Sequence, residues 1–278
     1  MKPPPFDYFQ AKNIDEVLSI LNDYGDDAQI LAGGQSLVSM LNMRLIKPKI
    51  IIDINFIENT DYITVKNKSI LIGPTYRQLD LEKRVKSKFD LPLIYEAIHY
   101  IGHTQHRARG TIIGSICHGD PTSELPLCFL ALNGKITLRN KYRKRQVDAS
   151  NFFLGPLITA IETNEIATEV EFPICQKETG YAFEEISEKF GDFAIASFAA
   201  IYAKADALDI NLNIFLSIIS ERSILIDPEI VLFIPSSLYS WFLLIPDFPV
   251  LRLWVTSLRL FPIGESIPMP VITALAIN

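Results

Sequence analysis

Cysteine is scarce in this chain of 278 residues. The three cysteines, Cys117, Cys128 and Cys175, are an odd number and include no CxxC pair, which excludes a disulfide framework. The N-terminal stretch MKPPPFDYF lacks the apolar core of a signal peptide. The uncharged run 230–246 is interrupted by Pro235, and its length is marginal for a membrane span. We therefore expect a protein of the reducing cytoplasm, not a membrane protein.

An excess of positive charge is also missing. The net charge is -6 and the isoelectric point is about 5.3, which argues against a nucleic-acid partner. The basic run Arg139–Arg145 lies between two strand-like segments, so it is interpreted as a solvated hairpin. With 49% hydrophobic residues, the chain is long and apolar enough to fold into two or three packed subdomains.

Neither the Rossmann GxGxxG motif nor the P-loop GK[ST] motif occurs, which excludes the two commonest nucleotide-binding folds. Two other glycine turns are present, LAGGQS at 31–36 and TIIGS at 111–115. Each is predicted to lie between a strand and a helix, where backbone N–H groups can meet an anion. Asp120 and Glu124 follow the second turn and can accept hydrogen bonds from hydroxyl groups. Two such turns favour a ligand with a diphosphate and hydroxyls, such as a dinucleotide.

Apolar spacing predicts alternating strands and helices. Asn13 is expected to cap the first helix and Gly25 to end it. The remaining predicted elements are strands at 28–31, 50–54, 69–73, 135–139 and 165–172, with helices following Ser36 and at about 79–85, 91–100 and 125–132. A third region opens at Tyr181. The fold class is therefore α+β, with two α/β subdomains and the start of a third domain.

Several segments carry a family resemblance. They are LAGGQSLVSMLNMRLIKPKIIIDI, IGHTQHRARGTIIGSICHGDPTSELP, FFLGPL, EIATEVEFP and GYAFEEISEKFGDFAIAS. From about Tyr8 to about Lys204 the chain resembles the FAD-binding medium subunit of the molybdenum hydroxylases, a group that includes aerobic carbon monoxide dehydrogenase and the flavin domain of xanthine dehydrogenase. The resemblance implies an FAD-binding domain of the molybdopterin dehydrogenase type.

The resemblance also implies a set of cofactor-binding residues. The two turns are expected to hold the FAD pyrophosphate, three later polar residues to contact its ribityl and adenosine parts, and one aromatic residue to lie beside the flavin ring. These residues are Ala32, Gly33, Gly34, Gln35 and Ser36; Thr111, Ile112, Ile113, Gly114 and Ser115; Asp120, Ser123 and Glu124; and Phe193. No residue is expected to act as a catalytic acid or base.

By the same resemblance, the chain passes electrons from iron–sulfur clusters to an external acceptor. Its implied partners are an iron–sulfur small subunit and a molybdopterin large subunit, assembled as a dimer of heterotrimers. The alternative is a non-catalytic remnant with impaired cofactor binding and a frameshifted C-terminus.

Two departures from the family pattern bear on that alternative. Ile113 stands where the family usually has a glycine, and a β-branched residue in a phosphate turn is expected to weaken FAD binding. After Lys204 there is no further lysine, and Gly264 is the one glycine. We expect an irregular or poorly packed tail there. The predicted parts are 1–57 and 58–176 as FAD-binding subdomains, 177–205 as the start of an incomplete or aberrant C-terminal domain, and 206–278 as a divergent apolar tail.

All four histidines fall within a short stretch beside Cys117: they are His99, His103, His106 and His118. The spacing of His99 and His103 can place two imidazoles on one helix face, as in some zinc sites. However, Gly102 interrupts that helix and no HExxH motif accompanies it. No metal site is predicted.

Overall fold

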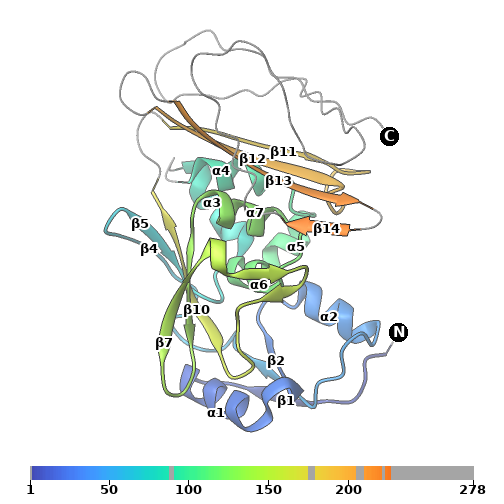
Figure 1. Ribbon diagram of the computed structural model, residues 1–278. Helices are drawn as coiled ribbons and strands as arrows, with labels where there is room; N and C mark the ends of the chain where they lie inside the picture. The colour runs from blue at the N-terminus through green and yellow to red at the C-terminus, as the bar shows by residue number, and fades with distance from the viewer. Residues whose placement is uncertain (1, 88–90, 175–178, 205–209, 221–222, 227–278) are drawn as a thin grey trace.

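The structure is a computed structural model that describes residues 2–87, 91–174, 179–204, 210–220 and 223–226. Figure 1 shows three stacked parts: an N-terminal unit, a central unit of helices and a sheet, and a sheet that covers the central helices on the far side. The predicted α+β class is confirmed. In the part of the chain so described, every helix is too short or too polar to cross a bilayer.

The N-terminal unit is a small parallel sheet with two helices. Its elements are β1 (Asp7–Gln10), α1 (Ile14–Tyr24), the 3-10 turn η1 (Gly25–Asp27), β2 (Ala28–Leu31), α2 (Gln35–Asn42) and β3 (Ile50–Asp53), with strand order β1-β3-β2. The side chain of Asn13 accepts a hydrogen bond from the Glu16 amide, and Gly25 ends α1 at a φ of 52°, as predicted. The helix after the first turn ends at Asn42.

The central unit has a five-stranded antiparallel sheet with order β4-β5-β10-β6-β7. Its strands are β4 (Ile63–Lys66), β5 (Ser69–Ile72), β6 (Lys135–Arg139), β7 (Lys144–Asp148) and β10 (Ile166–Pro173). Its helices are α3 (Gln78–Ser87), α4 (Pro92–Ala97), α5 (Thr104–Arg109), α6 (Ile112–His118) and α7 (Glu124–Ala131). The 3-10 turn η2 (Ala149–Asn151) leads to a hairpin of β8 (Phe153–Gly155) and β9 (Ile158–Thr159). The basic run forms the β6–β7 hairpin, as predicted.

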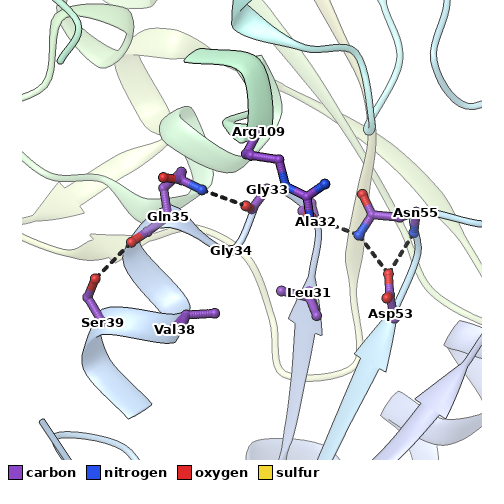
Figure 2. A pocket seen from close by; sticks show the side chains of 10 residues that line it. All are labelled: Leu31, Ala32, Gly33, Gly34, Gln35, Val38, Ser39, Asp53, Asn55 and Arg109. Atoms are coloured by element: carbon purple, nitrogen blue, oxygen red, sulfur yellow. Dashed lines mark hydrogen bonds between the residues drawn. The ribbon is translucent and has the colours of Figure 1, made fainter. Parts of the chain in front are cut away.

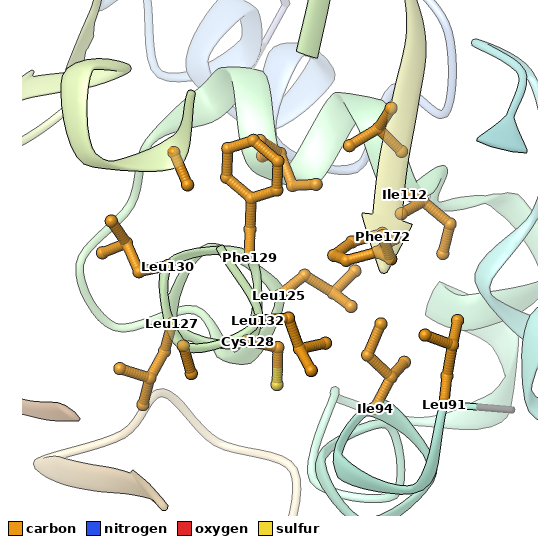
Figure 3. Packing of buried hydrophobic residues seen from close by; sticks show 14 of the residues in the cluster. Leu91, Ile94, Ile112, Leu125, Leu127, Cys128, Phe129, Leu130, Leu132 and Phe172 are labelled. Atoms are coloured by element: carbon orange, nitrogen blue, oxygen red, sulfur yellow. The ribbon is translucent and has the colours of Figure 1, made fainter. Parts of the chain in front are cut away.

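Helix α7 lies at the centre of the main hydrophobic core. All eight of its residues are buried, which agrees with the apolar sequence that follows Glu124. Figure 3 shows Phe129 of α7 among the packed side chains, and its ring makes edge contacts with Phe152, Phe153 and Phe172. This core joins the helices to β5, β6 and β10, and thereby fixes the place of α6 beside them.

The third sheet consists of β11 (Thr179–Ile186), β12 (Ala196–Lys204), β13 (Ile210–Ser220) and β14 (Ser223–Ile226), paired antiparallel in that order. It lies across α4 and α7 (Figure 1). The expectation of an irregular tail after residue 205 is wrong for 210–220 and 223–226, because both segments pair in this sheet. The run 230–246 and the rest of the tail lie outside the described residues.

Candidate functional site

The first glycine turn connects β2 to α2, as predicted. Gly34 is the N-cap of α2 and has a φ of 72°, a conformation that glycine adopts without steric strain. The first N–H groups of an α-helix have no partner within the helix. The turn therefore presents backbone donors, together with the positive end of the α2 dipole, to an anion.

The second turn differs from its prediction. It follows helix α5 and not a strand, and Thr111 forms an isolated antiparallel bridge with Arg77. Thr111 is the N-cap of α6, where its Oγ1 accepts a hydrogen bond of 3.1 Å from the Gly114 amide. The amide of Gln78 donates to the Gly110 carbonyl at 2.9 Å. Arg77 and the first residue of α3 therefore hold the second turn in place.

The two turns meet through their backbones. A Cβ built on Gly33 would lie 2.7 Å from the Arg109 carbonyl oxygen, 2.8 Å from the Gly110 Cα and 3.0 Å from the Thr111 nitrogen. Separations below 3.0 Å are not seen for real Cβ atoms. Only glycine fits at position 33, and the pair of turns picked out from the sequence forms one continuous surface.

Ile113 does not occupy the position assumed from the sequence. It lies within α6, is not among the residues of positive φ, and its side chain is 4% exposed in the main core. The expected strain and obstruction of a phosphate by its side chain are therefore wrong. Ile112 is equally buried, so both residues could contact a cofactor through the backbone alone.

A cavity of about 340 Å³ lies beside the first turn. Figure 2 shows its walls, which come from the turn, the start of α2, the end of β3 and the end of α5. The lining residues are Leu31, Ala32, Gly33, Gly34, Gln35, Val38, Ser39, Asp53, Asn55 and Arg109. The cavity combines apolar walls, one carboxylate and one guanidinium, as expected for a ligand with an apolar part and an anionic part.

Four of the predicted residues line this cavity, namely Ala32, Gly33, Gly34 and Gln35. Ser36 and the residues 111–115 do not line the cavity. The backbone nitrogen of Thr111 is nevertheless close to Gly33, 3.0 Å from where its Cβ would lie. Sequence reasoning missed Asp53, Asn55 and Arg109. The signal for the first two was their place at the carboxyl end of the parallel strand β3, where ligands of α/β units commonly bind.

The three predicted polar residues after the second turn lie in different environments. Asp120 Oδ1 accepts hydrogen bonds from the amide and the hydroxyl of Thr122, at 2.8 and 2.7 Å. Ser123 is the N-cap of α7, with no cap bond from its side chain. Glu124 is 8% exposed, and burial raises its pKa to about 8. A protonated Glu124 can donate a hydrogen bond as well as accept one.

The predicted flavin-ring neighbour lies on another part of the surface. Phe193 is 75% exposed. Two residues before it, Gly191 packs against Gly102 and His103. A half-buried acid lies on β11. Burial raises the pKa of Glu185 to about 7, and its two carboxyl oxygens are buried with no hydrogen-bond partner among the described residues. The structure does not bring Phe193 into the cavity of Figure 2.

Three of the four histidines make local contacts. His99 Nδ1 lies 2.8 Å from the Tyr95 carbonyl oxygen, and the His103 amide donates to His106 Nδ1 at 3.3 Å. Within the described ranges, no group of three or more His, Cys, Asp or Glu side chains could hold a metal ion.

Comparison with known proteins gives consistent results. Residues 4–175 match the family described as the FAD binding domain in molybdopterin dehydrogenase. The 6-hydroxypseudooxynicotine dehydrogenase complex subunit alpha of Paenarthrobacter nicotinovorans is 38% identical, over 72% of this chain and 68% of the relative. The carbon monoxide dehydrogenase medium chain of Hydrogenophaga pseudoflava is 36% identical, over 74% and 71%. A solved carbon monoxide dehydrogenase from Hydrogenophaga pseudoflava is similar with a TM-score of 0.74 and 35% identity, covering 78% of this chain and 75% of that one.

Proposed function

The chain belongs to the family of FAD-binding domains of the molybdopterin dehydrogenases, and on this premise we propose that it is the electron-transfer flavoprotein subunit of a molybdenum hydroxylase. As a family member it binds FAD and is a subunit of an oxidoreductase. In the proposed role, FAD receives electrons from iron–sulfur clusters on a partner and passes them to an external acceptor.

One observation carries the assignment of the site. Gly33 packs on the backbone of Arg109, Gly110 and Thr111, which brings the two turns together at the N-terminus of α2 beside the cavity. When two turns adjoin in this way, a diphosphate can accept hydrogen bonds from both at once, which supports the assignment. We propose that the first turn and Thr111–Ser115 hold the pyrophosphate, with Asp120, Ser123, Glu124 and Phe193 toward the ribityl chain and the ring.

The residues of this chain have a binding role and no role in bond chemistry. Glycines 33 and 34 keep side chains away from the anion, and Arg109 contributes positive charge to the cavity wall. Bound FAD supplies the redox chemistry, exchanging electrons one or two at a time. The protein holds the cofactor and tunes its surroundings.

The proposed partners follow from the relatives, which include carbon monoxide dehydrogenase medium chains. We propose an iron–sulfur small subunit and a molybdopterin large subunit, in a cytoplasmic dimer of heterotrimers. We also propose 1–57 and 58–176 as the FAD-binding subdomains, followed by a C-terminal domain whose sheet begins at β11.

Purification of the tagged full-length chain from its own cells tests this function. The proposal predicts a flavin absorbance spectrum, release of FAD on denaturation, and co-purification of subunits that contain iron, sulfur and molybdenum. A colourless protein that recovers no flavin on incubation with FAD would support the remnant alternative instead.

A further inference from the structure

A pair of polar side chains bridges the two turns. Asn55 Nδ2 donates to the Ala32 carbonyl in the first turn at 2.8 Å. Asn55 Oδ1 accepts from Arg77 Nη2 at 2.6 Å, and Arg77 Nη1 donates to the Arg109 carbonyl at 2.5 Å. A continuous chain of hydrogen bonds therefore runs from one turn to the residue that packs against Gly33 from the other.

Asp53 fixes the orientation of the Asn55 amide. Its Oδ1 accepts from the Asn55 backbone N–H at 2.9 Å and from Nδ2 at 2.7 Å, as Figure 2 shows. Its Oδ2 accepts from the Tyr8 hydroxyl at 2.6 Å. A carboxylate accepts hydrogen bonds but cannot donate them when ionised. The Asn55 amide nitrogen must therefore face Asp53 and Ala32, which directs its oxygen to Arg77.

The surroundings of Arg77 hold its side chain in one place. Its backbone pairs with Thr111, the N-cap of α6, so its side chain starts beside the second turn. Burial and the neighbouring Arg109 lower the pKa of Arg77. Arg77 contacts the side-chain oxygen of Asn55 in the β1–β3 unit and the carbonyl oxygen of Arg109 in the central unit.

We propose that Arg77, oriented by Asn55, is a positioning residue that sets the distance between the two turns and so makes the site selective for a diphosphate over a monophosphate. The inference rests on the proposed FAD site. In the proposed site, one phosphate can bind at one turn, whereas two linked phosphates contact both turns at once and so depend on their separation. A site held at that separation before binding loses less conformational freedom when the ligand arrives.

A second link between the same two units provides a comparison. Arg139 of β6 pairs with Asp15 of α1 at 2.7 Å, with both side chains exposed. This pair joins the units without touching either turn. If Arg77 served only to attach the units to each other, loss of Arg139 would have a similar effect on the ligand.

The test measures the affinity of the full-length apo chain for FAD, ADP and AMP by calorimetry. For Arg77→Met we expect FAD and ADP affinities to fall about tenfold or more, the loss expected when a charge-assisted hydrogen bond leaves a preorganised site. AMP affinity should change by less than about twofold, because one turn suffices for it. Arg139→Met should leave all three affinities unchanged.

Arg77→Lys keeps the charge but lacks the fork of donors that contacts Asn55 and Arg109 together. We expect it to lose the same preference for ADP over AMP, and it serves as the test if Arg77→Met does not fold. A folded Arg77 variant that keeps the full preference for ADP over AMP would overturn the inference. So would an equal loss of this preference in Arg139→Met. Neither result would contradict FAD binding by the wild type. A wild type that binds neither FAD nor ADP would defeat the proposed function and this inference with it.

Discussion

The carbonyl oxygen of Arg109 lies 2.7 Å from the point that a Cβ on Gly33 would occupy. Two turns that are far apart in the sequence are thus in backbone contact, and the contact is possible only because residue 33 has no side chain. Packing of the two turns therefore requires glycine at position 33 whether or not a ligand is bound. The candidate FAD site therefore lies at the junction between the N-terminal unit and the central unit.

Gly33→Ala is expected to lower the free energy of unfolding by about 1–3 kcal/mol, as overpacking does, and to reduce FAD occupancy. The backbone of Arg109 and Gly110 cannot move aside as a flexible side chain would. Gly155→Ala is the matched control, because its Cβ would meet ordinary contacts at 3.8 Å or more. Thermal unfolding and flavin absorbance measure both effects. Equal behaviour of the two variants would show that the turns are not in contact.

Ile113→Gly is expected to destabilise the fold without tightening FAD binding. The side chain is buried in the core, and its removal costs about 2–5 kcal/mol, with about 1 kcal/mol more for a glycine within a helix. Ile113→Val should cost only about 0.5–1.5 kcal/mol. Urea unfolding gives the stabilities. Tighter FAD binding by a stable Ile113→Gly protein would restore the view that this residue obstructs the phosphate.

Glu124 is expected to make the apo protein less stable as the pH rises. Burial raises its pKa in the folded state from 4.5 to about 8, so the fold keeps a proton that the unfolded chain releases. Its contribution is fully present below pH 4.5 and is lost as the pH rises through about 8. Glu96 and Glu185, with pKa values raised by burial to about 6 and about 7, act in the same direction.

Glu124→Gln should therefore flatten part of this pH dependence. Its free energy of unfolding relative to that of the wild type should be higher at pH 8 than at pH 5. Chemical unfolding at several pH values measures the slope. The exposed Glu58 provides a matched Glu→Gln control that should leave the slope unchanged. A slope that is the same in wild type and Glu124→Gln would contradict the assignment.

Arg107→Met should destabilise the fold far more than Arg139→Met. Arg107 is 9% exposed in its side chain and pairs with Glu82 at 2.9 Å, and it also donates to the Ile101 and Gly102 carbonyls. Loss of one partner of a buried pair costs about 3–5 kcal/mol, whereas exposed pairs contribute about 0–1 kcal/mol. Calorimetric unfolding distinguishes these ranges. A difference below about 1 kcal/mol would show that Arg107 does not anchor α5.

Local signals in the sequence were enough for most of the first unit, although the strand β1 was not predicted. Asn13 as a cap, Gly25 as a stop and the β2–Gly33–Gly34–α2 turn each follow from chemistry within a few residues. The meeting of the two turns could not be read in this way, because it depends on how α5 and β2 pack. Asn55 and Arg77 carry no motif, and the partners through which they link the two turns lie more than twenty residues away.

Two errors had readable signals. Ile112, Ile113 and Ile116 follow helical spacing, which indicated a buried helix face at the second turn. The resemblance to a family turn with two glycines instead predicts that Ile113 faces the phosphate. In 210–220, INLNIFLSIIS opens with polar and apolar residues that alternate, as in a strand. The absence of lysine and glycine predicts an irregular tail there, whereas the alternation agrees with the observed strand β13.

The most direct test of the central claim is calorimetric titration of the purified full-length apo chain with FAD and with FMN. Two adjoining turns at the N-terminus of α2 should favour a diphosphate. We expect noncovalent binding of one FAD per chain, with much weaker binding of FMN. Equal affinity for FAD and FMN, or no binding of either, would contradict it.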